Sequence, residues 1–178
     1  MRKISLVSSI LMVSQTLSTS LAEELFIPKL EPCVFTSKDI ALLTNTQYDS
    51  DGEEIIFTED LNYPGLAHSK YVDGKPMVYY NPHSMRNYSS DFQTLVFYHE
   101  IGHFKLNHHQ ESAYYRLFGI GKDREQREAE ANCYAIKVLK EELKCSPEQM
   151  KGIYIDVFKY YSDYFPGEVP GFKECLDK

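Results

Sequence analysis

The clearest periodic pattern of apolar and polar positions lies in residues 91–108. Apolar and histidine side chains recur there at intervals of three and four residues, which is the spacing of one helix face. The positions on this face are Phe92, Leu95, Val96, His99, His103 and Leu106. Ser90, followed three residues later by Gln93, is a capping-box pattern. We therefore predict a helix over residues 91–108, with the histidines on its buried face.

A second helix is predicted over residues 124–142. Asp123 and Gln126 form another capping box at its start. Residues 109–122 are predicted to connect the first two helices. The buried stripe of the second helix is expected to contain Ala131, Ala135, Val138 and Leu139.

A third helix is predicted to begin at Ser146 and Pro147, because serine caps helices and proline is favoured in the first turn. Beyond it we expect an irregular tail over residues 166–178, tied down by Cys175. One side of the third helix carries the apolar and aromatic residues Met150, Ile153, Tyr154, Val157, Phe158 and Tyr161.

Short strands are predicted upstream of these helices. Turn signals at residues 49–52 and 62–65 flank an expected strand over residues 54–58. Asp73-Gly74 precedes a strand over residues 77–81 and predicts a tight hairpin. Strands followed by helices predict an α+β fold with a short, mostly antiparallel sheet.

The first 22 residues have the pattern of a cleaved secretory signal. Two basic residues precede an uncharged, mostly apolar run, and Ser20-Leu21-Ala22 presents small residues at the positions that a signal peptidase reads. An uncleaved membrane anchor is the alternative, but the run is short and rich in serine for a bilayer span. We expect residues 1–22 to be removed. Residues 23–178 would then be a single exported domain, periplasmic or secreted, without stable membrane insertion.

The net charge limits the possible partners of the protein, and the cysteine content indicates whether its environment is oxidising. Without Arg2 and Lys3 of the signal, 17 basic and 26 acidic residues give a net charge of −9. An acidic chain argues against a nucleic acid partner. An even number of cysteines in an exported chain predicts two disulfides with the pairing left open, although Cys133 in a predicted helix could also be a buried free thiol. The four cysteines are Cys33, Cys133, Cys145 and Cys175.

An H-E-x-x-H motif, His99-Glu100-Ile101-Gly102-His103, lies within the first predicted helix. Residues four apart share one helix face, so both imidazoles can reach one Zn²⁺ ion. Glu100 then lies beside the metal, where it can act on a bound water. Gly102 weakens a helix by about 1 kcal/mol relative to alanine, which is sensible where another backbone comes close. The motif predicts a zinc hydrolase.

A catalytic zinc site requires a third protein ligand. Glu128 lies on the same buried stripe as Ala131, and a carboxylate on a buried face requires a cation, so Glu128 is preferred. Its alternative role is an ion pair with Arg127 or Arg116. The full set of candidate third ligands is Glu125, Glu128, Glu130, His108 and His109.

His109 defines a rival ligand set. It follows His99 by ten residues, as the third histidine does in the metzincin pattern. That pattern has a glycine where this chain has Leu106, because the helix must break there, and the sequence shows no break at residues 105–107. We therefore expect His108 and His109 to form a solvated helix end, where histidine suits the negative end of the helix dipole.

Residues 128–135 read Glu-Ala-Glu-Ala-Asn-Cys-Tyr-Ala. This segment resembles the second-helix signature E-x-x-A-[DN]-x-[FY]-A of the gluzincins, in particular of their compact minigluzincin type. Gluzincins are zinc peptidases in which a glutamate ligand on a second helix follows the H-E-x-x-H helix. The resemblance covers residues 76–140. It implies a small zincin-like domain with an active-site helix and a following ligand-bearing helix.

By position, the resemblance implies that His99, His103 and Glu128 bind zinc and that Glu100 is the general base. Asn132, where larger members often have aspartate, would orient a zinc-bound imidazole. A substrate would add antiparallel to the edge strand that precedes the first helix. In this chain that strand is Met77, Val78, Tyr79, Tyr80 and Asn81.

Together these features predict an exported zinc-dependent endopeptidase that hydrolyses a peptide or protein substrate with a zinc-bound water activated by Glu100. An oxyanion donor is expected from Tyr114, Tyr115 or Tyr134. One alternative is a catalytically silent or latent peptidase-like domain that binds a peptide or protein partner. In a latent form, residues 23–38 would cover the site, or Cys33 would bind the zinc. A zinc-stapled structural protein is a further alternative.

Overall fold

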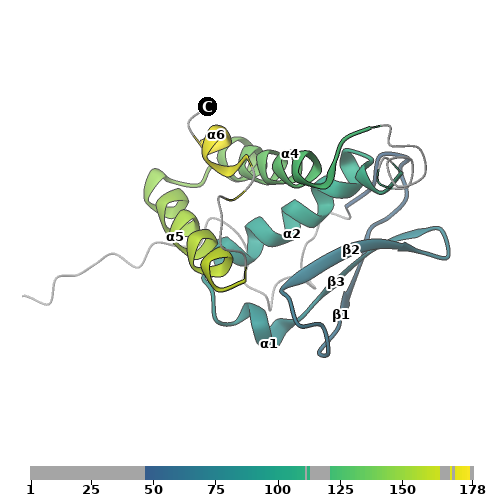
Figure 1. The fold of residues 1–178 in the computed structure, drawn as a ribbon, viewed down its shortest axis with the longest axis horizontal. Coiled ribbons are helices and arrows are strands. Elements are labelled where there is room, and N and C mark those ends of the chain that lie inside the picture. The colour runs from purple at the N-terminus through teal and green to yellow at the C-terminus, as the bar shows by residue number, and fades with distance from the viewer. Residues whose placement is uncertain (1–46, 111, 113–120, 165–168, 170, 177–178) are drawn as a thin grey trace, which may run out of the picture.

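The computed structural model describes residues 47–110, 112, 121–164, 169 and 171–176 (Figure 1). The expected signal sequence and Cys33 lie outside these residues. In Figure 1 the helix α2 (Ser90–Lys105) runs between a small sheet and the helix α4 (Arg124–Lys137). The predicted α+β class is confirmed, but the sheet is mixed rather than mostly antiparallel.

The sheet has three strands in the order β1-β3-β2. β1 (Ile56–Glu59) runs parallel to β3 (Lys75–Tyr80), and β2 (Ala67–Val72) runs antiparallel to β3. Asp73 and Gly74 have positive φ angles of 52° and 79° and close the predicted hairpin between β2 and β3. Such angles suit a type I′ turn, whose twist matches that of the two strands.

The expectation that residues 77–81 form a substrate-binding edge strand is wrong. Residues 77–80 lie in β3, the central strand, whose main chain pairs with β1 on one side and β2 on the other. Asn81 follows the strand and caps α1 (Pro82–Met85), where its Oδ1 accepts from the amide of His83 at 2.9 Å. The parallel pairing with β1 joins segments some twenty residues apart, so local sequence pattern did not reveal it. Among the described residues, β2 has an unpaired edge.

The start of α2 differs from the prediction by one residue. Its N-cap is Ser89, whose Oγ accepts from the Phe92 amide, and Gln93 donates its side-chain amide to the Tyr88 carbonyl. The predicted capping box of Ser90 with Gln93 is therefore wrong. Both serines suit an N-cap, and a tertiary contact selects between them, because Asp156 accepts from the amide and the Oγ of Ser89.

The end of α2 also differs. The helix ends at Lys105, Leu106 is its C-cap, and Asn107 has a φ of 59°. Asparagine is among the few residues that tolerate this left-handed conformation. The prediction of an unbroken helix through residues 105–107 is wrong, and the chain turns there before residues 108–110 resume a helical conformation.

The second helix follows the prediction. α4 begins with both hydrogen bonds of the Asp123–Gln126 capping box and continues into one π-helical segment, η2 (Val138–Glu142). The predicted stripe of Ala131, Ala135, Val138 and Leu139 is buried. This stripe faces α2, which is the main packing partner of α4.

The third helix, α5 (Pro147–Tyr164), begins as predicted, because Ser146 Oγ accepts from the Gln149 amide at 3.2 Å. Ile153 and Val157 are buried, but Tyr154 and Phe158 are 43% and 64% exposed. The buried face of this helix is therefore narrower than the apolar face predicted from the sequence.

The tail is not wholly irregular, because α6 (Phe172–Leu176) forms a short helix. A disulfide between Cys133 and Cys175 fastens α6 to α4, as expected for a tail tied down at Cys175. The alternative of a free thiol at Cys133 is wrong. Cys145 is also disulfide-bonded.

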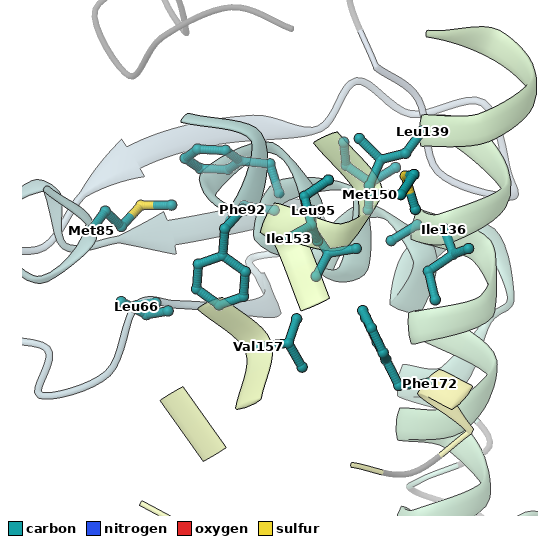
Figure 2. Packing of buried hydrophobic residues seen from close by; sticks show 14 of the residues in the cluster. Leu66, Met85, Phe92, Leu95, Ile136, Leu139, Met150, Ile153, Val157 and Phe172 are labelled. Atoms are coloured by element: carbon teal, nitrogen blue, oxygen red, sulfur yellow. The ribbon is translucent and has the colours of Figure 1, made fainter. Parts of the chain in front are cut away.

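The core lies where α2 meets α4, η2 and α5 (Figure 2). Phe172 of α6 packs into the same cluster. None of the described helices is both long and apolar enough to span a membrane. Labelled members of the core in Figure 2 include Leu95, Ile136, Leu139, Ile153 and Val157.

Candidate metal site

Three side chains from two helices converge on one point. His99 and His103 lie one turn apart on α2, and their Nε2 atoms are 3.1 Å apart. Oε2 of Glu128 on α4 lies 3.2 Å from His99 Nε2 and 3.9 Å from His103 Nε2. Donors held tetrahedrally at about 2.0–2.1 Å from one zinc ion are separated by roughly 3.3 Å. This group could therefore hold a metal ion, and Glu128 is the predicted third member.

The three side chains face a cavity of about 710 Å³. His99 and His103 are mostly buried, and Glu128 is 29% exposed. The cavity is lined by residues of β2, α2, α4 and α5. A metal ion held here would thus be reachable from the cavity, as a catalytic site with an open coordination position requires.

Gly102 allows the two ligand-bearing helices to approach closely. A Cβ at this position would lie 3.4 Å from the Cα of Ala131 on α4 and 3.1 Å from the ring of Tyr134. The absence of a side chain brings Glu128, one turn before Ala131, within reach of the histidines. The expectation that another backbone lies close to Gly102 is confirmed.

Among the described residues, the ion-pair partners of Glu128 are His99 and His103. Arg127 donates instead to the carbonyl of Lys122, and Arg116 lies outside the described residues. Burial raises the pKa of Glu128, but the hydrogen bond and charge of His99 outweigh burial, so its pKa is lowered. The other acidic candidates are not part of this group: Glu125 lines the cavity but is exposed, and Glu130 pairs with Lys122.

Asn132 binds the ring nitrogen of His99 that does not face the ligand group. Its Oδ1 accepts from His99 Nδ1 at 2.8 Å, which leaves the Nε2 lone pair directed at the ligand group. Burial disfavours the imidazolium of His99, but Glu128 and Glu100 outweigh it, so the pKa of His99 is raised. Asn132, four residues after Glu128, therefore occupies the position that the resemblance implied.

His108 and His109 are not a solvated helix end, so that expectation is wrong. The left-handed turn at Asn107 directs His108 inward, where it is 2% exposed and its Nδ1 lies 3.0 Å from Nδ1 of His103. Burial and the neighbouring imidazoles of His99 and His108 lower the pKa of His103 well below its usual value. Sequence reasoning missed His108 because a single left-handed residue redirects the chain.

His109 lies outside the ligand group, although the helix break that the rival ligand set requires is present. Its ring packs 4.7 Å from the ring of Phe104 and 5.6 Å from that of Tyr71. Burial and the nearby His108 lower its pKa to about 4. The structure thus favours Glu128 over His109 as the third donor.

Glu100 is 8% exposed and reaches the cavity beside His99. Ser69 on β2 donates its hydroxyl to Oε2 of Glu100 at 2.7 Å. Burial raises the pKa of Glu100, although His99 and Ser69 act in the opposite direction. A buried carboxylate of raised pKa beside a metal-binding group is suited to accept and return a proton.

Three tyrosines that the sequence analysis did not propose as oxyanion donors line the cavity: Tyr63, Tyr160 and Tyr161. Burial and the charge of Glu128 raise the pKa of Tyr161 to about 12, and its hydroxyl hydrogen-bonds with the side chain of Asn132. Tyr134 packs on Gly102 and is not among the cavity-lining residues. Tyr114 and Tyr115 lie outside the described residues. The sequence signal for Tyr161 was its place on the inward side of the third helix.

Comparison with known proteins identifies no relative. No family model matches the chain, no curated protein is significantly similar to it, and no solved structure matches its fold.

Proposed function

We propose that this protein is an exported zinc-dependent endopeptidase of gluzincin type. The observation that carries the proposal is the convergence of His99, His103 and Glu128 on one point, with Glu100 beside them at the wall of a cavity. Two imidazoles and one carboxylate are the donor set of several catalytic zinc hydrolases, and they leave a position open. The disulfide between Cys133 and Cys175 supports an oxidising, exported location.

His99, His103 and Glu128 would hold a zinc ion, which would supply a Lewis acid able to polarise the scissile carbonyl and acidify water. Glu100 takes the proton of the attacking water and passes it to the leaving amine. Ser69 keeps the carboxylate of Glu100 directed at the reacting atoms. Asn132 keeps the Nε2 lone pair of His99 directed at the metal.

The substrate strand is proposed to add to β2 rather than to β3. β2 carries Ala67, His68 and Ser69 at the wall of the cavity, and its outer edge is unpaired among the described residues. An extended peptide can pair with such an edge through main-chain hydrogen bonds. The scissile bond would then lie next to Ser69 and the Glu100 that it holds.

Tyr161 is the proposed oxyanion donor. Oδ1 of Asn132 accepts from His99, so its side-chain amide donates to the Tyr161 hydroxyl and leaves the phenolic proton available to the cavity. A pKa of about 12 keeps the hydroxyl protonated at neutral pH, which a donor to a developing negative charge requires. Tyr161 is proposed in place of Tyr134, which does not line the cavity, while Tyr114 and Tyr115 lie outside the described residues.

The apolar part of the cavity supports selection of a large hydrophobic side chain. Phe92 and Val96 of α2 and Val157 and Tyr160 of α5 are among its lining residues, and the ring centroids of Phe92 and Tyr160 lie 6.2 Å apart. Burying one such side chain contributes about 1.5–3 kcal/mol, enough to favour substrates that carry it. We therefore expect cleavage next to aromatic or large aliphatic residues.

The test is hydrolysis of an unstructured peptide library by zinc-loaded protein without residues 1–22, beside Glu100→Gln. We expect cleavage to fall by at least about 1,000-fold in this variant while zinc binding persists, because the base is removed and the ligands are kept. Glu148→Gln, at an exposed glutamate of α5, is the matched control and should cleave normally. Equal turnover by Glu100→Gln would contradict the mechanism. Zinc binding without any cleavage by the unaltered protein would favour the silent or latent peptide-binding domain.

A further inference from the structure

The residues behind His103 form a connected polar chain that leads away from the ligand group. Nδ1 of His103 lies 3.0 Å from Nδ1 of His108, and Nε2 of His108 lies 3.1 Å from Oε2 of Glu130. The same oxygen accepts from Nζ of Lys122 at 2.7 Å. His108 is 2% exposed, whereas Glu130 and Lys122 are 40% and 38% exposed. These contacts therefore connect the metal site to the protein surface through the buried imidazole of His108.

Metal binding fixes the direction of every hydrogen bond in this chain. His103 Nε2 faces Glu128 and His99, so its lone pair binds the ion and its Nδ1 must carry the proton. His108 Nδ1 must then accept, which leaves its proton on Nε2. That proton is donated to Glu130, whose carboxylate also accepts from Lys122. No two donors or two acceptors oppose each other.

The residues of this polar chain come from the same segments that set the geometry of the metal site. Glu130 lies two residues after Glu128 on α4, and Lys122 precedes the N-cap of that helix. His108 is directed inward by the left-handed conformation of Asn107, directly after the helix that carries His99 and His103. The link from His108 to Glu130 thus joins the end of α2 to the start of α4, alongside the ligands.

We propose that His108, held by Glu130, is a positioning residue that fixes the tautomer and orientation of the zinc ligand His103. This inference rests on the proposed metal site and extends it. His103 and His99 are then supported differently: Asn132 holds His99 by a neutral amide, whereas a histidine and a carboxylate hold His103. A carboxylate joined through an imidazole strengthens His103 as an electron-pair donor to a metal.

The test is zinc affinity, measured by competition with a chromogenic chelator, for the unaltered protein and for His108→Phe. Phenylalanine keeps the buried ring and removes both nitrogens, so we expect affinity to fall by about 10–100-fold. His109→Phe is the matched control, because His109 is the adjacent buried histidine outside the chain, and its zinc affinity should change little. Thermal unfolding of the metal-free proteins shows whether His108→Phe folds.

Glu130→Ala keeps the inference testable if His108→Phe does not fold. Glu130 is 40% exposed, so alanine there is compatible with the fold, and we expect a smaller loss of zinc affinity in the same direction. Nitrogen-15 NMR of the zinc-loaded protein provides a readout that a purely structural role would not change. We expect the proton of His108 on Nε2 and that of His103 on Nδ1.

Unchanged zinc affinity in folded His108→Phe, or a proton of His108 on Nδ1, would overturn this inference and leave the proposed function standing. Failure of the unaltered protein to bind zinc would overturn the metal site itself, and the inference with it. Loss of peptide cleavage in a folded His108→Phe variant that keeps its full zinc affinity would likewise count against the positioning role.

Discussion

Ser69 is the side chain of the sheet that reaches the proposed general base. It lies on β2, the strand nearest to α2, and its hydroxyl donates to Glu100 across 2.7 Å. The proposed attack of water on the peptide bond depends on the orientation of the Glu100 carboxylate, because a general base must lie within hydrogen-bonding distance of the proton that it removes. In the proposed mechanism, a residue 31 positions earlier in the chain therefore orients the general base.

Ser69→Ala is expected to lower kcat roughly tenfold, since the carboxylate of Glu100 loses the bond that directs it. Zinc affinity should stay unchanged, because Ser69 contacts none of the three ligands. Ser69→Thr keeps the hydroxyl and should restore most of the activity. Steady-state kinetics on one cleaved peptide, with zinc content determined in parallel, measures both effects. A normal kcat in Ser69→Ala would show that Glu100 is positioned without it.

Asp49 illustrates a residue whose effect is on stability rather than on the site. Its carboxylate accepts from the amides of Asp51 and Glu53, both at 2.9 Å, and from the hydroxyl of Tyr71 at 2.7 Å. Burial raises its pKa, but these hydrogen bonds, that of Tyr71 foremost, outweigh burial and lower it. The ionised form is therefore favoured by folding.

A lowered pKa gives stability that is complete above the unfolded pKa, about 3.9, and is lost as pH falls through the folded value. We expect Asp49→Asn to be less stable by about 1–3 kcal/mol at pH 7, because the amide is a poorer acceptor for three donors. The variant should also lose less stability than the unaltered protein below about pH 4. Urea unfolding from pH 3 to 7 measures this, with Asp51→Asn as the exposed control. Parallel pH curves would contradict the assignment.

At the scale of the elements, the packing of α2 against α4 brings together the three residues that could hold a metal ion. Gly102 and Ala131 are the small residues at this crossing, and a Cβ on Gly102 would already be tight against Tyr134 and Ala131. The contact explains why a helix-weakening glycine lies between the two histidines. The H-E-x-x-H spacing alone places two ligands, and this crossing supplies the third.

Gly102→Val is expected to destabilise the fold by about 1–3 kcal/mol, because the branched side chain overpacks the crossing. It should also weaken zinc binding, since α4 must shift away from α2 and carry Glu128 with it. Gly152→Val is the matched control: a Cβ at Gly152 on α5 meets nothing within 4 Å, so zinc affinity should be unaffected. Chemical denaturation and chelator competition measure the two effects. Tight zinc binding by Gly102→Val would show that the crossing does not set the ligand geometry.

At the scale of the whole molecule, a bound metal would join two helices that the chain connects through residues 109–122. Ligands that bind only the folded state stabilise it by mass action. The Cys133–Cys175 disulfide fastens α4 to α6 by a covalent bond. A metal at the candidate site would hold α4 to α2, whereas the disulfide holds α4 to α6.

Zinc in 100-fold excess over its Kd is expected to stabilise the protein by about 2.7 kcal/mol. For a domain of this size that corresponds to a rise in Tm of roughly 5–10 °C. A chelator such as EDTA should reverse the rise, and a His99→Ala, His103→Ala double variant should show none. Differential scanning calorimetry with and without zinc measures the shift. An equal shift in the double variant would place the metal elsewhere.

The sequence by itself determined the local features of this protein. Capping residues fixed the starts of α4 and α5, the Asp73-Gly74 pair fixed the hairpin, and the stripe containing Ala131 identified the face of α4 that carries Glu128. Each depends on hydrogen bonds or side-chain spacing within a few residues, which a linear pattern records. The juxtaposition of His99, His103 and Glu128 could be predicted for the same reason, because both helices must bury their apolar faces against each other.

Only the tertiary structure decided the features that depend on distant segments. The parallel pairing of β1 made β3 central and moved the available edge to β2, and Asp156 of α5 selected Ser89 over Ser90 as the cap of α2. The left-handed turn at Asn107 brought His108 behind His103. Asparagine adopts the left-handed conformation at little cost in free energy, and such a residue is not visible in the periodic pattern of the sequence. Strand order is set by contacts between distant segments of the fold. The residues proposed to bind metal could therefore be predicted from the sequence. The residues that support them, and the strand proposed to hold substrate, could not.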